Sequence, residues 1–281
     1  AIFNSIPMNL KKAVSVGIGF FIAFIGLQNA KIVVGGATLV QLFSLDAVEG
    51  ATMNDAGICV LLAIIGVFIT AILVLKEVKG NILWGILITW LLGIICQFTG
   101  LYVPNAEIGY YSLLPDFSAG LSVPSLAPIF MKLDFTAIPI AEFVVIIFAF
   151  LFVDIFDTLG TLIGVASKAD MLDEEGRLPR IKGALMADAV ATTAGAVMGT
   201  STTTTFVESA SGVTEGGRTG LTSMTTAILF LLSLLLSPVF LAIPSFATAP
   251  ALIIVGFYMV NQVGLIDFTD YAEGIPAFIC I

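Results

Sequence analysis

Two aspartates, Asp154 and Asp157, lie inside an apolar run from Ala141 to Ala166. A single Asp at the centre of a membrane-spanning helix costs about 2.5–3.5 kcal/mol even on a lenient insertion scale. On a helix these two acids share one face with Thr158 and Thr161, while the rest of the surface is apolar. We therefore expect this polar stripe to face a helix bundle or a water-filled cavity. Acids at that depth typically form a substrate, ion or proton site.

The two aspartates are separated by about 4.5 Å of helical rise. Two like charges this close in poor solvent are hard to ionise together, so one of them is suited to carry a proton. The alternative is a patch of hydrogen bonds between helices. A third acid, Asp188, sits in the next apolar run with Thr192 one turn later. It either takes part in function or pairs with a neighbouring hydroxyl for structure.

A polar tract, Gly199-Thr-Ser-Thr-Thr-Thr-Thr-Phe206-Val-Glu208-Ser, follows that run. Consecutive threonines favour extended chain over helix. Extended backbone at membrane depth is tolerated only where it is buried in protein or lines a cavity, and transporters build binding sites from such broken helices. Two alternatives remain open: Thr205 and Glu208 only form a capping box, or the tract is an exposed loop.

The elements that position these residues are predicted to be membrane-spanning helices. The chain has 281 residues, of which 58% are hydrophobic and 11% are charged, whereas a soluble domain is about 25% charged. Apolar runs of about 20 residues recur, each long enough to cross a bilayer. The expected helices are Leu10–Asn29, Gly57–Leu75, Asn81–Phe98, Ala141–Ala166, Arg180–Thr200, Thr219–Leu241 and Ala249–Gln262, with a short helix at Phe206–Gly212 and another starting near Ala272.

The basic residues give the orientation. If the chain crosses the bilayer at each span and again at the threonine tract, one side receives all of the 11 Lys and Arg residues except Lys31 and Lys132. The positive-inside rule then makes that side cytoplasmic. We expect Leu101–Pro139 to form an external loop with short helical pieces.

Other features narrow the function. The chain has no histidine, which removes the usual zinc, copper or haem ligand, and we expect neither a metal nor a cofactor. No basic cluster indicates nucleic acid. Two GxxxG pairs, Gly160 with Gly164 and Gly195 with Gly199, are predicted to let helices approach closely.

Three segments together resemble the AzgA-like purine permeases of the nucleobase–cation symporter group. They are Phe152-Val-Asp-Ile-Phe-Asp-Thr-Leu-Gly-Thr-Leu-Ile-Gly164, the tract from Gly199 to Gly212, and Thr214-Glu-Gly-Gly-Arg-Thr-Gly220. The similarity extends to Phe20–Asn29 and Ala249–Gly256 and covers essentially the whole chain.

The resemblance implies an all-α polytopic fold of fourteen spans in two inverted halves of seven, divided into a core and a gate. Each half contains one span broken by a short β-strand. By similarity the chain is an internal fragment that starts at the fifth span and ends within the thirteenth. Residues 1–140 then hold gate spans five to seven, 141–241 core spans eight to eleven with the break at 200–212, and 242–281 the start of the second gate segment.

By the same resemblance, Asp157 and Glu208 match substrate-binding carboxylates and Asp188 matches a functionally important acid. We assign substrate binding also to Thr205, Phe206 and Val207 beside Glu208, with Phe206 stacking on the base. Asp154, Asp188, Thr158 and Thr161 are assigned to proton coupling or to support of the site.

The predicted function is proton-coupled uptake of adenine, guanine or hypoxanthine across the cytoplasmic membrane. A nucleobase is flat and mostly neutral, so a carboxylate can accept its N–H groups while a protonatable acid supplies the coupling. Na⁺ in place of H⁺ and a homodimer are left open by the sequence. The alternatives are an anion transporter of the same architecture, disfavoured because no Lys or Arg falls inside a span, and an intramembrane aspartyl enzyme.

Overall fold

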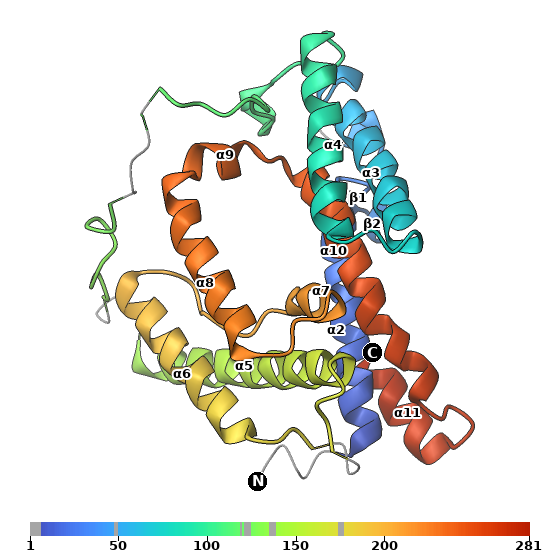
Figure 1. The fold of residues 1–281 in the computed structure, drawn as a ribbon, viewed down its shortest axis with the longest axis vertical. Coiled ribbons are helices and arrows are strands. Elements are labelled where there is room, and N and C mark those ends of the chain that lie inside the picture. Colours follow the sequence, from blue (N-terminus) through green and yellow to red (C-terminus); the bar gives the residue numbers. More distant parts are fainter. Residues whose placement is uncertain (1–6, 48–49, 119, 121–124, 135–138, 174–176) are drawn as a thin grey trace. The chain divides into compact units, whose positions relative to one another are not determined.

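The computed structural model describes residues 7–47, 50–118, 120, 125–134, 139–173 and 177–281, without the side chain of Phe156. Helices dominate the described chain (Figure 1). The α-helices are α2 Met8–Asn29, α3 Ile58–Leu75, α4 Asn81–Phe98, α5 Ile140–Lys168, α6 Ile181–Met198, α7 Ser209–Thr214, α8 Gly220–Leu235, α9 Ser237–Ala242, α10 Ser245–Val260 and α11 Tyr271–Cys280. A π-helical turn, Met53–Gly57, leads into α3, and a 3₁₀ turn, Asn261–Leu265, follows α10.

The long helices confirm the predicted membrane class. Among the described residues, five helical stretches are long and apolar enough to cross a bilayer: Met8–Asn29, Met53–Leu75, Asn81–Phe98, Ile181–Met198 and Ser245–Leu265. α5 is longer still, with 29 residues. Its large side chains Phe148, Phe150 and Phe152 are 67–71% exposed. Such a row of exposed aromatics is stable when lipid covers it, because soluble proteins rarely expose large apolar patches.

The predicted single helix Thr219–Leu241 is wrong, because the chain divides into α8 and α9 at Leu236. Pro238 lies in the first turn of α9. Proline is tolerated there because the first turn leaves its N–H groups unpaired, but within a continuous helix it would remove a hydrogen bond and clash with the preceding turn.

The chain divides into two compact units. One consists of the described parts of Ala1–Gly19, Pro124–Gly216 and Met259–Ile281, and the other of Phe20–Val123 and Gly217–Tyr258. Two of the four boundaries fall within helices, one in α2 and one in α10. The assignment of segments to a gate and a core stays a prediction.

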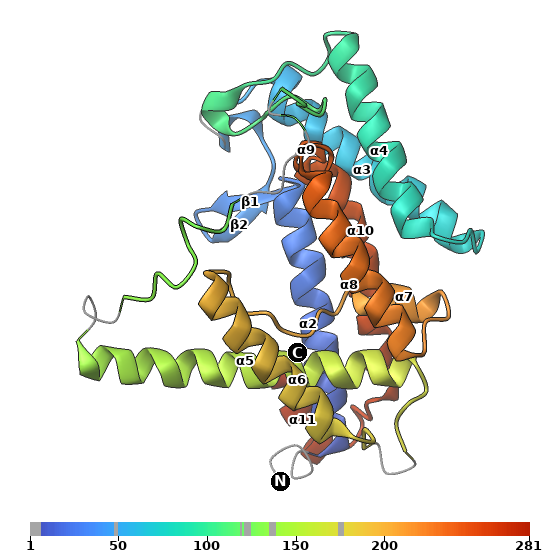
Figure 2. The ribbon, with the colours of Figure 1, turned by 60° about the vertical axis from the view of Figure 1, so that its left-hand side comes forward.

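The second unit is built around the antiparallel helices α3 and α4, which lie side by side in Figures 1 and 2. Gly66 of α3 faces Thr89 of α4, and Thr70 of α3 faces Gly85 of α4. Each threonine returns its hydroxyl to the carbonyl of the glycine one turn earlier, at 2.8 Å in α3 and 2.7 Å in α4. The repeated Gly-x-x-x-Thr pattern therefore lets the two helices approach closely without leaving a buried hydroxyl unpaired.

In the first unit, one of the two predicted GxxxG pairs is confirmed. A side chain at Gly160 would collide with Ile18 and Val14 of α2, and one at Gly164 with Met259. Ser15 also donates a hydrogen bond to the carbonyl oxygen of Gly160 at 3.1 Å. These glycines hold α5 against α2 at the level of the polar stripe.

The segment after α2 forms a β-hairpin that the sequence analysis did not predict. Strand β1, Val33–Gly36, pairs antiparallel with β2, Leu39–Leu42. Further along, the predicted external loop contains a 3₁₀ turn at Ala106–Ile108, flanked by a β-bridge between Asn105 and Tyr110. The described part of this loop therefore contains one short helical piece where several were predicted.

Candidate functional site

The polar stripe of α5 lies on one face of the helix, as the spacing predicts. Asp154 and Asp157 are partly buried, and Thr158 and Thr161 are each 2% exposed. Asp154 is the fifteenth of the 29 residues of α5, so the stripe begins at the middle of the helix. The acids thus lie far from either helix end.

The threonine tract runs along α5 at this level. The hydroxyl of Thr202 donates to Oδ1 of Asp154 at 3.4 Å, and the hydroxyls of Thr204 and Thr158 are 3.0 Å apart. Two residues of extended chain advance about 6.7 Å, and four residues of helix advance about 6.0 Å. Thr202 and Thr204, two residues apart, thereby meet Asp154 and Thr158, which are four residues apart on α5.

The other side of the tract faces α6. Thr192 of α6 places its hydroxyl 3.0 Å from the hydroxyl of Thr202 and 3.0 Å from the carbonyl oxygen of Thr203. A Cβ on Gly195 would lie 2.7 Å from the hydroxyl of Thr203. Three backbone groups of the tract bond to α6, namely the N–H of Thr200, the carbonyl oxygen of Thr203 and the N–H of Thr205. Its other bonds to the two helices come from threonine side chains.

These contacts bear on three expectations from the sequence: an exposed loop, a short β-strand and a close-packed glycine pair. Thr202, Thr203 and Thr204 bond to α5 or α6, while residues 200–203 are exposed in the described chain, so the exposed-loop alternative stays a prediction. The expected short strand is not formed within the described chain: residues 202–206 belong to neither a helix nor a strand. The Gly195–Gly199 pair does not join two helices. Gly195 makes room for the tract, and Gly199 ends α6 with a positive φ of 79°.

Asp188 joins α5, α6 and the tract. It is 9% exposed, and its Oδ2 accepts the hydroxyl of Thr158 at 3.1 Å. Its Oδ1 accepts the backbone N–H of Thr205 at 3.0 Å. Since Thr158 gives its hydrogen to Asp188, Thr204 donates to Thr158. For Thr158, these bonds agree with the alternative prediction that the polar stripe forms hydrogen bonds between helices.

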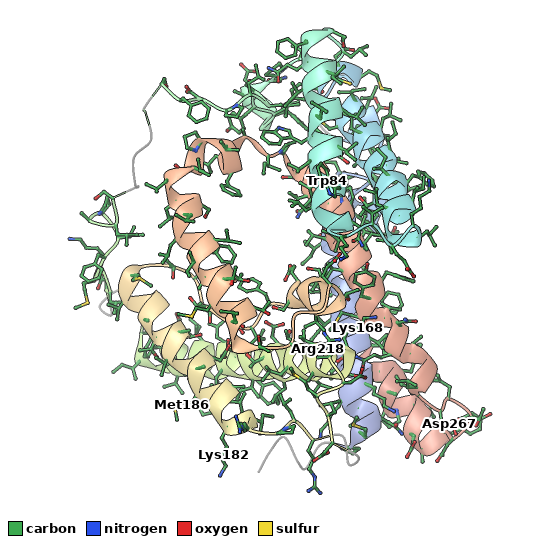
Figure 3. All side chains as sticks on the ribbon, in the orientation of Figure 1. Trp84, Lys168, Lys182, Met186, Arg218 and Asp267 are labelled. Atoms are coloured by element: carbon green, nitrogen blue, oxygen red, sulfur yellow. The ribbon has the colours of Figure 1, made fainter. Side chains whose placement is uncertain are left out.

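α6 keeps this acid inside while exposing its opposite face. Asp188 and Met186 are two residues apart, or about 200° around the helix. Met186 is 66% exposed. In Figure 3, Lys182 and Met186 project away from α6, and Figure 2 shows α6 crossing α5.

A cavity of about 480 Å³ opens beside the tract and contains both aspartates of α5. Its lining residues come from the three elements just described: Phe150, Leu151, Val153, Asp154, Asp157, Thr192, Ser201 and Thr202. This volume suits a small molecule. Within the described chain, the lining holds two acids, several hydroxyls and no Lys or Arg.

The two aspartates differ in their protein partners. Asp154 accepts the hydroxyl of Thr202. Within the described chain, no protein group donates a hydrogen bond to Asp157, although the carboxylates of Asp154, Asp188 and Glu208 are close enough to act on its charge. The oxygens of Asp157 are therefore the ones available to a ligand in the cavity.

The residues around Glu208 do not line this cavity. Glu208 is exposed at the N-cap of α7 and makes no cap hydrogen bond there, so the capping-box alternative is wrong. Phe206 is 60% exposed and Val207 is 3% exposed. The hydroxyl of Thr205 is buried and has no hydrogen-bond partner among the described residues.

The sequence analysis did not assign Thr192, Ser201, Thr202 and the apolar lining residues of α5 to the site. Two of them carried a usable signal. Thr192 follows Asp188 by one helical turn, and Val153 precedes Asp157 by one turn, so each shares a face with an acid that was selected.

Replacing Gly195 by Ala should disturb the tract. The new Cβ would lie 2.7 Å from Thr203 and 2.9 Å from Thr200, and such overpacking costs about 1–3 kcal/mol. Because Thr203 sits between the two threonines that meet α5, we expect substrate uptake to fall several-fold with normal membrane insertion. Gly183→Ala on the same helix is the control, since a Cβ there meets no described neighbour within 4 Å. Equal uptake by the two variants would contradict the idea that Gly195 is needed to make room for the threonine tract.

A cavity that contains two acids, set among helices of membrane length, is typical of a membrane transport protein. The chain belongs to the Permease family, whose model matches residues 3–281. This membership makes the chain part of a permease and contradicts the alternative of an intramembrane enzyme.

Named relatives agree with this membership. The chain is 49% identical over its whole length to protein MJ0326 of Methanocaldococcus jannaschii. It is 41% identical over 99% of its length to the guanine/hypoxanthine permease PbuG of Bacillus subtilis. It is 36% identical over 98% of its length to the adenine permease AdeQ of Escherichia coli. The aligned chain covers 59%, 58% and 57% of these relatives, respectively.

Proposed function

We propose that this permease imports purine nucleobases together with protons. The observation that carries the proposal is the cavity with Asp154 and Asp157 beside the threonine tract. The relatives named as guanine/hypoxanthine and adenine permeases support the substrate class. The polar groups of this mainly apolar cavity are acids and hydroxyls, with no basic residue of the described chain. Such a lining suits a flat neutral base with N–H groups and disfavours an anion.

In this proposal Asp157 accepts N–H groups from one edge of the purine, since its oxygens are not used by the described protein. Glu208 and the adjoining Thr205, Phe206 and Val207 bind the rest of the base, with Phe206 stacking on its face. The N–H groups of Phe206, Val207 and Glu208 have no acceptor in the described part of the chain, and they are donors for the ring nitrogens or carbonyls of a base. Phe206 is exposed enough to take this role.

The coupled proton is carried by one of the clustered acids. Asp154, Asp188 and Glu208 all act on the charge of Asp157. Since the base is neutral, a proton bound to one of these acids lowers the repulsion between the carboxylates while the base is bound. Thr158 and Thr161 support the site from α5. The fourteen-span arrangement of core and gate belongs to the same proposal.

The test is uptake of labelled adenine, guanine and hypoxanthine by cells or vesicles that contain the complete protein. We expect accumulation that stops when an uncoupler collapses the pH gradient and that persists when Na⁺ is replaced by K⁺. Accumulation that follows the Na⁺ gradient, or that survives the uncoupler, would contradict proton coupling. Competition by sulfate or bicarbonate would favour an anion transporter instead.

A further inference from the structure

A second cavity lies wholly within the unit formed by Phe20–Val123 and Gly217–Tyr258. Its volume is about 460 Å³, within the range of small-molecule sites. It lies between the end of α2, the loop after α4 and the segment before α10. By the predicted orientation these three segments share the outer side of the membrane. The lining residues that matter below are Asn29, Lys31, Tyr110, Tyr111 and Ser112.

Tyr110 is the residue that points to a ligand. Its hydroxyl is buried and has no hydrogen-bond partner among the described residues, and such a group costs about 1–3 kcal/mol unless something pairs with it. Burial raises the pKa of Tyr110 to about 12. The hydroxyl therefore stays protonated at neutral pH and is a donor. Tyr102, which also lines the cavity, differs because its hydroxyl already donates to the carbonyl oxygen of Tyr111 at 2.6 Å.

The other polar groups of the lining are also mainly donors. Lys31 brings a positive charge, Asn29 an amide, and Ser112 a hydroxyl that is fixed by Gln97 at 3.0 Å. No carboxylate of the described residues lines this cavity. The exposed aromatic ring of Tyr111 supplies a face for a flat ligand. This chemistry is the opposite of the cavity beside Asp157, where acids line the described wall without a cation.

We propose that this outer cavity is a second binding site, for a planar heterocycle rich in acceptors and neutral or singly negative, of the oxopurine class. The ligand stacks on the aromatic lining, accepts a hydrogen bond from Tyr110 and is paired with Lys31. The site is separate from the transport cavity, so its occupancy does not depend on the function proposed above.

The test uses urate as the probe, because it is a flat oxopurine with a single negative charge at neutral pH. The complete protein carrying Asp157→Asn, which disables the transport cavity, is assayed for binding of labelled urate by equilibrium dialysis. We expect saturable binding, weakened about 10-fold by Tyr110→Phe and by Lys31→Gln as separate changes. No saturable binding, or unchanged binding in both variants, would overturn the proposal.

Thermal stability separates loss of the site from loss of the fold. Tyr110→Phe removes an unpaired buried hydroxyl, so stability should stay equal or rise. Tyr102→Phe removes a hydrogen bond within the protein, so it should lower stability while reducing urate binding less than Tyr110→Phe does. The reverse ranking for urate binding would contradict the role of Tyr110. If the protein without substitutions binds urate but takes up no purine, the transport proposal is refuted and the proposed outer site is still supported.

Discussion

Asp157→Asn should lower purine uptake about 100-fold while leaving membrane insertion unchanged. The substitution preserves shape but replaces one acceptor oxygen with an N–H donor, which then faces the N–H groups of the base. A buried hydrogen bond to a charged group is worth about 1.5–3 kcal/mol, and about 2.7 kcal/mol corresponds to 100-fold. Initial rates of labelled adenine and guanine uptake, normalised to the amount of protein in the membrane, measure the effect.

Asp154→Asn is the matched control, because it makes the same chemical change one turn away on the same face. Asp154 already accepts the hydroxyl of Thr202, and an Asn oxygen can keep that bond. We therefore expect a smaller loss of uptake than at Asp157. If the larger loss occurs at Asp154, the ligand lies one turn nearer the N-terminus of α5. If both variants take up purine at the normal rate, the cavity is not the transport site.

The sequence was sufficient for the membrane spans because each is defined by a local property. A run of about 20 apolar residues must be helical in a bilayer, where every backbone group needs a partner within its own segment. The prediction Asn81–Phe98 agrees with α4 residue for residue. The polar face of α5 was likewise visible, because its acids are spaced at the period of the helix.

The arrangement of the site could not be predicted because it depends on contacts between distant parts of the chain. Thr202 bonds to Asp154 across 48 positions and Thr158 to Asp188 across 30. No local pattern reports which threonines face α5 and which face α6. The four threonines predicted an extended tract, but the pairing of that tract with hydroxyls and an acid, rather than with a strand, required the fold.

Glycine spacing was a similarly incomplete guide. Gly160 and Gly195 both begin a GxxxG pattern. Gly160 lies against helix α2, whereas Gly195 lies against the threonine tract. The pattern says only that a backbone is approached closely, not by what. Gly195 contacts the hydroxyl-rich segment after Gly199, because that segment folds back against α6, the helix that precedes it.

Asp188→Asn is expected to abolish both accumulation and exchange of purines. The carboxylate holds two donors, the hydroxyl of Thr158 and the N–H of Thr205. An Asn offers one acceptor oxygen, which can keep the N–H of Thr205. Its amide then faces Thr158, whose hydroxyl must reverse its bonds and loses a charged acceptor. A hydrogen bond to a charged group contributes about 1.5–3 kcal/mol, against about 0.5–1.5 kcal/mol for a neutral one. We therefore expect a lower unfolding temperature in detergent, together with loss of the cavity beside the tract.

Exchange is the measurement that separates this positioning role from proton carriage. A residue that only carries the proton can be neutralised without stopping the exchange of labelled for unlabelled purine across the membrane, whereas a residue that positions the site cannot. Retained exchange in Asp188→Asn would therefore assign it to the proton. A double-mutant cycle with Thr158→Val adds a second test: removal of that hydroxyl should cost less in the Asp188→Asn variant, because its acceptor is already compromised there. Thr193→Val is the control, since its hydroxyl donates to the carbonyl oxygen of Ala189 in its own helix.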